Sequence, residues 1–306
     1  MWAYALTAPG RLERLEAPEP FPADGEVLVR LRAGGICGSD LPSFRGRRSS
    51  FVDAHGEPGF PLHEAVGEVI SGALPAGARV VGWPKRHLGL AELFVSRVEE
   101  IIVLGDDTLG DVEATVIQPL ATVLYAVDRL GDVRGRRAAV LGLGPIGLLF
   151  THALATRGAH VTGIDRVDRR DVASAFGMEA AVWDDASTLE TDAFDVVVEA
   201  VGHQTGTLQD AIAALSLHGT LLAFGVPDDA QYPFPFTSFF RKGATLITGP
   251  ASERAASLEA AREYLASAPE LLGPYITHVL DVHRAQEAFE RAIAPAAGQL
   301  KIVLKV

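Results

Sequence analysis

The middle of the chain alternates short apolar runs with helical patterns, and this alternation constrains the fold more than any other feature. The apolar runs, interpreted as strands, lie at residues 137–144, 160–165, 194–202, 220–225 and 244–249. The predicted helices lie at residues 145–158, 169–177 and 207–219. Strands that alternate with helices form parallel βαβ units, whose sheet is buried on both faces. Residues 114–250 are therefore expected to form an α/β domain with a doubly wound parallel sheet.

A glycine-rich turn joins the first of these strands to its helix. Gly142, Gly144 and Gly147 have the spacing G-x-G-x-x-G, with Pro145 and Ile146 between the last two. The first glycine permits a tight turn, the second lets a pyrophosphate approach the backbone, and the third allows close packing of helix on strand. The N-terminus of the helix faces the anion. This context predicts a Rossmann dinucleotide site, and the alternative is a glycine turn in a nucleotide-free α/β protein.

An acidic residue ends the next predicted strand. Asp165 lies 18 residues after Gly147, where a carboxylate can accept hydrogen bonds from both ribose hydroxyls and repel a 2′-phosphate. We therefore expect NAD as the cofactor. Arg166, Arg169 and Arg170 follow directly and leave NADP as the alternative.

The two ends of the chain have a different pattern. Residues 1–113 contain short apolar runs ended by glycine, which predict a β-rich, irregular region. Two amphipathic helices are expected at 252–267 and 282–294, and the alternation in 300–306 predicts a half-exposed closing strand. A closing strand that returns to the first sheet makes the first domain discontinuous. We expect one domain from residues 1–117 and 252–306 and a second from 118–251.

Composition narrows the partners and the compartment. The net charge of -12 argues against nucleic acid and acidic membranes, because both bind positive surfaces. Residues 138–156 contain no Asp, Glu, Lys or Arg, but their glycines, their proline and their strand-like first half argue against a membrane span. A single cysteine in 306 residues is typical of a reducing compartment, so we expect a cytoplasmic protein.

That single cysteine, Cys37, is the first of three residues with metal-binding side chains. His63 and Glu64 are adjacent, and a thiolate, an imidazole and a carboxylate are all zinc ligands. The alternative is a small buried cysteine and a hydrogen-bonded histidine. Isolated histidines such as His55 and His87 are interpreted as surface or structural residues.

Five segments occur in an order that characterises one family: GGICGSD, LHEAVGEV, GLAELFV, IQPLATVLYAV and VLGLGPIGLL. Together they resemble the zinc-dependent medium-chain alcohol/polyol dehydrogenases, most of all the sorbitol, threonine and glucose dehydrogenases. The resemblance covers nearly the whole chain. It implies a GroES-like, β-rich catalytic domain made from both chain ends, and a Rossmann domain that binds NAD.

The resemblance also assigns roles to individual residues. Cys37 and His63 match the first two ligands of the catalytic zinc, and Glu64 matches a glutamate that binds the metal or lies just behind it. Gln118 matches a further ligand position that usually holds glutamate, aspartate or cysteine. Because a neutral amide binds zinc more weakly than a carboxylate, Glu64 becomes the better candidate. Ser39 matches the hydroxyl that passes the alcohol proton outward.

The chain departs from the family pattern at three places. Pro42 stands where the family commonly has a histidine, so a proton relay beyond Ser39 must differ. Leu62 replaces the glycine before the zinc histidine, which leaves the local backbone geometry open. The lobe whose four cysteines bind a structural zinc is missing, so we expect one zinc per chain.

The resemblance implies the reversible oxidation of a secondary alcohol (a polyol, cyclitol or sugar) to a ketone. The first alternative is a zinc-free double-bond reductase of the same fold that uses NAD(P)H. The second is a non-catalytic NAD-binding regulatory protein. In relatives, the edge strand that corresponds to 244–249 pairs with its twin, so we expect a homodimer.

Overall fold

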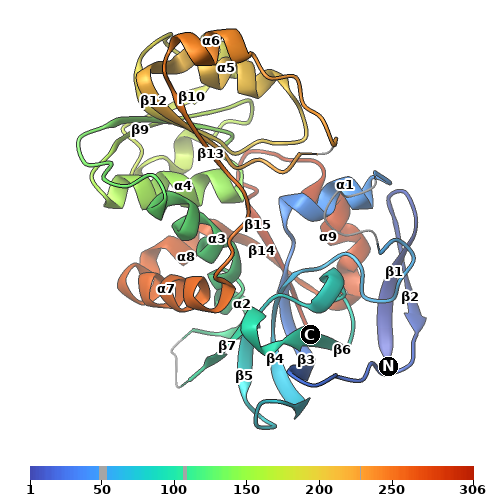
Figure 1. Cartoon of the computed structure of the whole chain (residues 1–306). Coiled ribbons are helices and arrows are strands. Elements are labelled where there is room, and N and C mark those ends of the chain that lie inside the picture. Colours follow the sequence, from blue (N-terminus) through green and yellow to red (C-terminus); the bar gives the residue numbers. More distant parts are fainter. Residues whose placement is uncertain (48–53, 106–108, 228) are drawn as a thin grey trace. The chain divides into compact units, whose positions relative to one another are not determined.

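The computed structural model describes residues 1–47, 54–105, 109–227 and 229–306 (Figure 1). These residues divide into two compact units. The first unit contains residues 1–121, 252–295 and 299–306, and the second contains 122–251 and 296–298. Both ends of the chain therefore belong to the first unit.

A mostly antiparallel sheet forms the centre of the first unit. Its strands follow the order β14 (Ile276–Asp281), β15 (Lys301–Lys305), β3 (Glu26–Gly35), β4 (Glu64–Gly72), β5 (Arg79–Gly82) and β7 (Ile101–Leu104), and β6 (Leu93–Arg97) also pairs with β3. A separate hairpin joins β1 (Trp2–Ala8) to β2 (Arg11–Glu16). The strand at the C-terminus pairs with β3, so the closing strand returns to the first sheet as expected.

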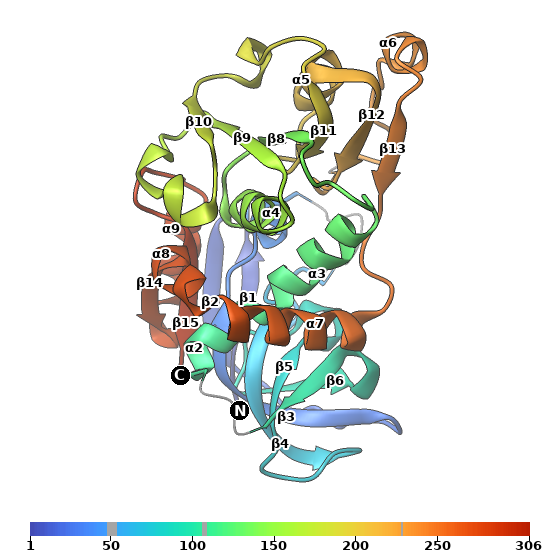
Figure 2. The same cartoon turned by 90° about the vertical axis from the view of Figure 1, so that its left-hand side faces the viewer.

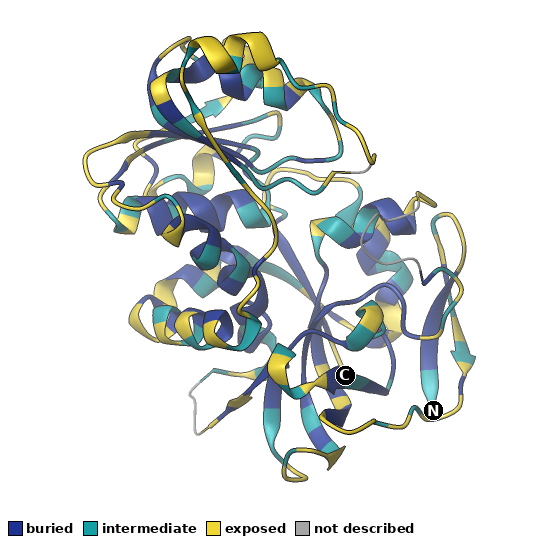
Figure 3. Cartoon of the chain, viewed as in Figure 1, coloured by how far each residue is buried: buried dark blue, intermediate teal, exposed yellow. Residues whose placement is uncertain are grey.

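The closing strand β15 is more buried than its sequence pattern indicates. Alternation predicts a half-exposed strand, but Lys301 to Leu304 are all buried (Figure 3). The strand lies between β14 and β3, and the helix α9 (Ala285–Ala292) packs against it. The lysine that alternation places in solvent therefore lies in the interior.

Several helices complete the first unit. They are α1 (Leu41–Phe44), α2 (Asp111–Ala114), α7 (Arg254–Ser267) and α8 (Leu272–Tyr275), together with α9. Apolar packing anchors them, as where the ring of Phe44 lies 5.3 Å from that of Phe289 in α9. The helix α3 (Ile117–Asp128) begins in the first unit and ends in the second.

The second unit is built on a parallel sheet (Figure 2). Its order is β10 (Ala180–Trp183), β9 (His160–Asp165), β8 (Arg137–Leu141), β11 (Phe194–Glu199), β12 (Leu215–Ala223) and β13 (Thr245–Thr248). The direction of winding reverses between β8 and β11, as in dinucleotide-binding sheets. The helix α4 (Pro145–Thr156) packs on β8 and β9, and α5 (Gly206–Ala214) packs on β11 and β12. The predicted doubly wound α/β fold is confirmed.

Two helix predictions in this unit were wrong in extent. Residues 169–177 form only the short 3-10 turns Arg170–Val172 and Ser174–Phe176, and Gly177, with a left-handed φ of 70°, ends the second of them. The helix expected over 207–219 ends at Ala214, since Leu215 is extended and begins β12. A short helix, α6 (Phe236–Arg241), lies between β12 and β13. Within the described ranges, no helix is long and apolar enough to cross a membrane.

Candidate active site

The turn after β3 presents the thiol. The chain passes from Gly35 through Cys37 into the short helix Gly38–Asp40. The backbone N–H of Cys37 donates to the Asp40 carboxylate at 3.3 Å, and the N–H of Asp40 donates to the Cys37 carbonyl at 3.1 Å. A Cβ at Gly35 would lie 2.2 Å from a carboxylate oxygen of Glu64, so only glycine leaves room there. This glycine therefore lets Cys37 and Glu64 lie close together.

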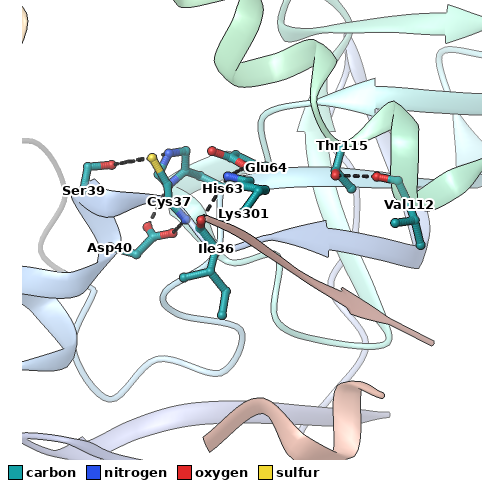
Figure 4. A network of polar contacts seen from close by, with 9 residues as sticks. All are labelled: Ile36, Cys37, Ser39, Asp40, His63, Glu64, Val112, Thr115 and Lys301. Carbon is teal, nitrogen blue, oxygen red and sulfur yellow. Dashed lines mark hydrogen bonds and ion pairs between the residues drawn. The ribbon is translucent and has the colours of Figure 1, made fainter. Parts of the chain in front are cut away.

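His63 precedes β4 and points toward the same thiol. Its Nδ1 lies 2.7 Å from Oδ1 of Asp40, which fixes the ring with Nε2 on the side of Cys37. The Ser39 hydroxyl lies 3.5 Å from this Nε2 and donates to the Cys37 sulfur at 3.3 Å. Figure 4 shows these four side chains gathered at one point. The arrangement leaves a histidine nitrogen, a sulfur and a hydroxyl oxygen facing one another.

Asp40 and His63 form a buried ion pair. Burial by itself would lower the pKa of His63, but the Asp40 carboxylate and the Cys37 sulfur outweigh it and raise this pKa well above the usual value. Burial would likewise raise the pKa of Asp40, but the charge and hydrogen bond of His63 outweigh it and lower this pKa. A carboxylate behind the ring therefore keeps Nδ1 protonated and reserves Nε2 for a ligand.

Glu64 is fully buried beside the thiol and is paired with a lysine that sequence analysis did not single out. Lys301, 1% exposed, forms an ion pair with Oε2 of Glu64 and donates a hydrogen bond to the carbonyl of Ile36 at 2.9 Å. The ammonium group thus links the carboxylate to the loop that carries Cys37 (Figure 4). The sequence pattern predicted only a half-exposed closing strand, and no local signal singled out Lys301.

These side chains have the chemistry of a zinc site. The donor atoms of Cys37, His63 and Glu64 all lie within 4.8 Å of one another. Among the described residues, Oε1 of Glu64 has no hydrogen-bond partner, although the carboxylate is completely buried. Catalytic zinc takes sulfur, nitrogen and carboxylate ligands and keeps one position open. The residues present therefore fit a zinc ion.

Two residues that the family comparison raised have different outcomes. Leu62 adopts no positive φ and is fully buried, and its side chain fills the space that a Cβ on Gly34 would occupy. The glycine on the neighbouring strand thus accommodates the leucine before His63. Gln118 is buried near the start of α3, but no hydrogen bond joins it to Cys37, His63 or Glu64 within the described residues. Its role as a ligand stays a prediction.

A second histidine lies against the first. The rings of His87 and His63 have centroids 4.4 Å apart, and a donor atom of His87 lies within 4.8 Å of those of Asp40 and His63. Burial and the charge of His63 lower the pKa of His87 to about 3, so its ring is neutral. The structure thus places His87 beside His63 and outside the set formed by Cys37, His63 and Glu64, whereas sequence analysis gave it only a surface or structural interpretation.

The glycine turn of the second unit has the form that a dinucleotide requires. Gly142 adopts a left-handed φ of 87°, which permits the tight turn after β8. A Cβ at Gly147 would lie 1.7 Å from the Gly142 carbonyl oxygen, so the close helix packing needs glycine. A Cβ at Gly144 meets no atom within 4 Å, which leaves open space in front of the helix N-terminus. Pro145 and Ile146 form the first, half-buried turn of α4.

Asp165 ends β9 beside this turn. Its carboxylate accepts the N–H of Leu143 at 2.5 Å and that of Val167 at 2.7 Å, so it also stabilises the glycine loop. Two of the three arginines considered for a 2′-phosphate have carboxylate partners of their own, and the third, Arg169, donates a hydrogen bond to the Ala296 carbonyl at 2.9 Å. Arg166 pairs with Asp185, and Arg170 pairs with Asp168 while its guanidinium lies 5.2 Å from the Trp183 ring centroid.

Comparison with known proteins agrees with this fold. The model "Glucose dehydrogenase C-terminus" matches residues 113–306, and "Alcohol dehydrogenase GroES-like domain" matches residues 23–94. D-arabinitol dehydrogenase 1 of Uromyces fabae is 24% identical over 100% of this chain and 97% of its own length. Sorbitol dehydrogenase of Bacillus subtilis is 25% identical over 94% of this chain and 92% of its own length. The crystal structure of 2R,3R-butanediol dehydrogenase from Bacillus subtilis shares the fold, with a TM-score of 0.78 and 22% sequence identity. The match covers 100% of this chain and 99% of that one.

The fold and the matching models define the class of protein. A GroES-like β-rich domain is followed by a Rossmann-type parallel sheet, and the two matching models cover most of the chain. The chain therefore belongs to the zinc-type medium-chain alcohol/polyol dehydrogenase family.

Proposed function

We propose that this protein is a zinc-dependent dehydrogenase that transfers a hydride between a secondary alcohol and NAD, giving a ketone. The substrate class is a polyol, cyclitol or sugar-like alcohol. The observation that carries the proposal is the convergence of Cys37, His63 and Glu64 within 4.8 Å, beside the Ser39 hydroxyl. The relatives named for D-arabinitol and sorbitol support the substrate class.

Different residues of the chain have different roles in this reaction. A zinc ion held by Cys37, His63 and Glu64 would polarise the alcohol oxygen and lower the pKa of its hydroxyl. Ser39 accepts the hydroxyl proton, because its half-buried Oγ lies next to both Cys37 and His63. The glycine turn would hold NAD by its pyrophosphate, and the nicotinamide would supply the acceptor for the carbon-bound hydrogen as hydride. The products are a ketone, NADH and one proton.

The two rival functions predict different measurements. A zinc-free double-bond reductase needs no metal, whereas the buried donor set supports zinc. A non-catalytic NAD-binding protein turns over no alcohol. The test is a panel of polyols, cyclitols and sugars assayed by NADH absorbance with zinc-loaded protein and either NAD or NADP. Turnover of a secondary alcohol supports the proposal, and its complete absence across the panel contradicts it.

The same assay tests the cofactor. We expect kcat/KM to be at least about tenfold higher with NAD than with NADP, equivalent to ~1.4 kcal/mol, because the Asp165 carboxylate repels the 2′-phosphate. Asp165→Asn should narrow this gap, since it removes the charge. The N–H groups of Leu143 and Val167 bond to different oxygens of the carboxylate, so the single amide oxygen retains only one of these two hydrogen bonds. Equal kcat/KM with the two cofactors in the wild type would show that Asp165 does not select between them.

We further propose that the protein is a homodimer formed at the edge of the parallel sheet. The strand β13 ends the sheet, and Leu246 on it is 42% exposed. An exposed apolar edge strand promotes aggregation unless it is paired or covered. Sedimentation at micromolar concentration should give about twice the chain mass of 32.4 kDa. A monomer under these conditions would contradict the proposal.

A further inference from the structure

His87 borders the place where the reacting oxygen is expected to bind. Its ring centroid lies 4.4 Å from that of His63, with 33° between the ring planes. One donor atom of His87 lies within 4.8 Å of the donor atoms of Asp40 and His63. His87 is therefore a direct neighbour of the proposed ligand set without being needed to complete it.

The backbone holds this histidine in an unfavourable conformation. Arg86 and His87 have φ values of 55° and 59°, in the left-handed region that residues other than glycine rarely adopt. Such a conformation persists only where surrounding contacts impose it, and it is found most often at functional sites. Two hydrogen bonds of 2.6 and 2.7 Å tie the Arg86 guanidinium to Glu57, and the Leu62 N–H donates to the His87 carbonyl at 2.9 Å. The turn is thus fastened to the residue that precedes His63.

The His87 side chain keeps its hydrogen-bonding capacity. Its ring is half-buried, and among the described residues neither ring nitrogen has a hydrogen-bond partner. A neutral imidazole carries one donor and one acceptor nitrogen, which suits a hydroxyl group that needs both. A half-buried ring with both nitrogens available is placed to bind part of a ligand rather than to stabilise the core.

We infer that His87 is a specificity-determining residue that hydrogen-bonds the substrate hydroxyl on the carbon next to the reacting carbon. The inference rests on the proposed function. An alcohol oxygen bound at the Cys37–His63–Glu64 set carries its vicinal hydroxyl one carbon further on, and the ring of His87 is the polar group that lies against His63 outside this set. A site that hydrogen-bonds a substrate hydroxyl discriminates against the analogue that lacks it, because the protein group is then left without a partner.

A matched pair of alcohols tests this role. 2,3-Butanediol, with its stereoisomers assayed separately, and 2-butanol differ by one hydroxyl. We expect zinc-loaded wild type to oxidise its preferred butanediol isomer with a kcat/KM at least about tenfold above that of 2-butanol, as for the loss of one hydrogen bond. In His87→Phe, which keeps an aromatic ring against His63, kcat/KM for the diol should fall about tenfold or more while that for 2-butanol is unchanged.

An equilibrium measurement separates binding from turnover. Titration of the cobalt-substituted protein with each alcohol, followed in the visible absorption bands, gives dissociation constants. His87→Phe should weaken diol binding and leave 2-butanol binding unaltered. If phenylalanine is not accepted in the left-handed backbone, His87→Gly removes the ring without backbone strain and should give the same selective loss. Zinc content, measured beside each variant, should stay at the wild-type level.

The outcomes distinguish this inference from the proposed function. If wild type oxidises both alcohols equally well, or if both variants lose activity toward the two alcohols by the same factor, the role of His87 is refuted while the dehydrogenase stands. If wild type oxidises no secondary alcohol, the proposed function fails and the role of His87 fails with it. Selective loss of the diol in both kcat/KM and the dissociation constant establishes the role.

Discussion

Cys37→Ser is expected to lose zinc and dehydrogenase activity together, while binding of NADH survives. A serine hydroxyl is neutral at physiological pH, so the substitution removes the thiolate, which is the softest ligand and one of the two anionic ligands of the set. Wild type should hold about one zinc per chain, with one Zn–S contact near 2.3 Å in X-ray absorption. The variant should hold almost none. NADH binding persists because the glycine turn belongs to the other compact unit.

Ser39→Ala is the matched control for this result. It removes the hydroxyl that lies 3.3 Å from the Cys37 sulfur but leaves all three proposed ligands in place. This variant should retain zinc and lose about 10²–10⁴-fold in the proton-transfer step, as is usual for a general base. Zinc content and NADH binding, measured for wild type, Cys37→Ser and Ser39→Ala, test whether Cys37 is a zinc ligand. If wild type binds no zinc when loaded, or if Cys37→Ser turns over normally, Cys37 is only a small residue in a polar turn.

The sequence predicted those parts of the fold that depend on local pattern. The glycine turn was predictable because Gly142 and Gly147 are each required by a tight turn or a close approach, as their φ and Cβ contacts show. The continuous apolar runs of the strands likewise predicted a parallel sheet that is buried on both faces. Predictions failed where a short segment had competing preferences. Residues 169–177 formed two short 3-10 turns in place of the predicted helix, and β12 began at Leu215 within the predicted helix of residues 207–219.

The candidate site was predictable only in its donor types. Cys37, His63 and Glu64 could be named from chemistry and resemblance, since each is a zinc-binding side chain in a family motif. Lys301 and His87 could not be named, because their positions follow from long-range contacts. Lys301 reaches Glu64 only when the last strand pairs with β3, and His87 meets His63 through a strained turn bonded to Leu62. No periodic pattern in the sequence predicts the contact of Lys301 with Glu64 or that of His87 with His63.

Lys301→Met should destabilise the metal-free protein by about 3–5 kcal/mol. The Glu64 and Lys301 side chains are 0% and 2% exposed, so the substitution leaves a carboxylate buried without its cation. It also removes the hydrogen bond to the Ile36 carbonyl, next to Cys37. Urea unfolding should show a lower midpoint with an unchanged slope, which reports a change in stability rather than in the surface exposed on unfolding.

The double variant Glu64→Met/Lys301→Met separates the loss of the ion pair from the loss of the lysine's packing. Replacing both members of a buried ion pair by apolar residues of similar size is often neutral or stabilising, whereas removing one member is not. The double variant should therefore be more stable than Lys301→Met alone, although it lacks one of the proposed zinc ligands. If it is as unstable as the single variant, the packing of the lysine chain against β3, and not its charge, stabilises this end of the sheet. If Lys301→Met unfolds at the wild-type urea concentration, the ion pair with Glu64 contributes nothing, and its importance for the site is refuted.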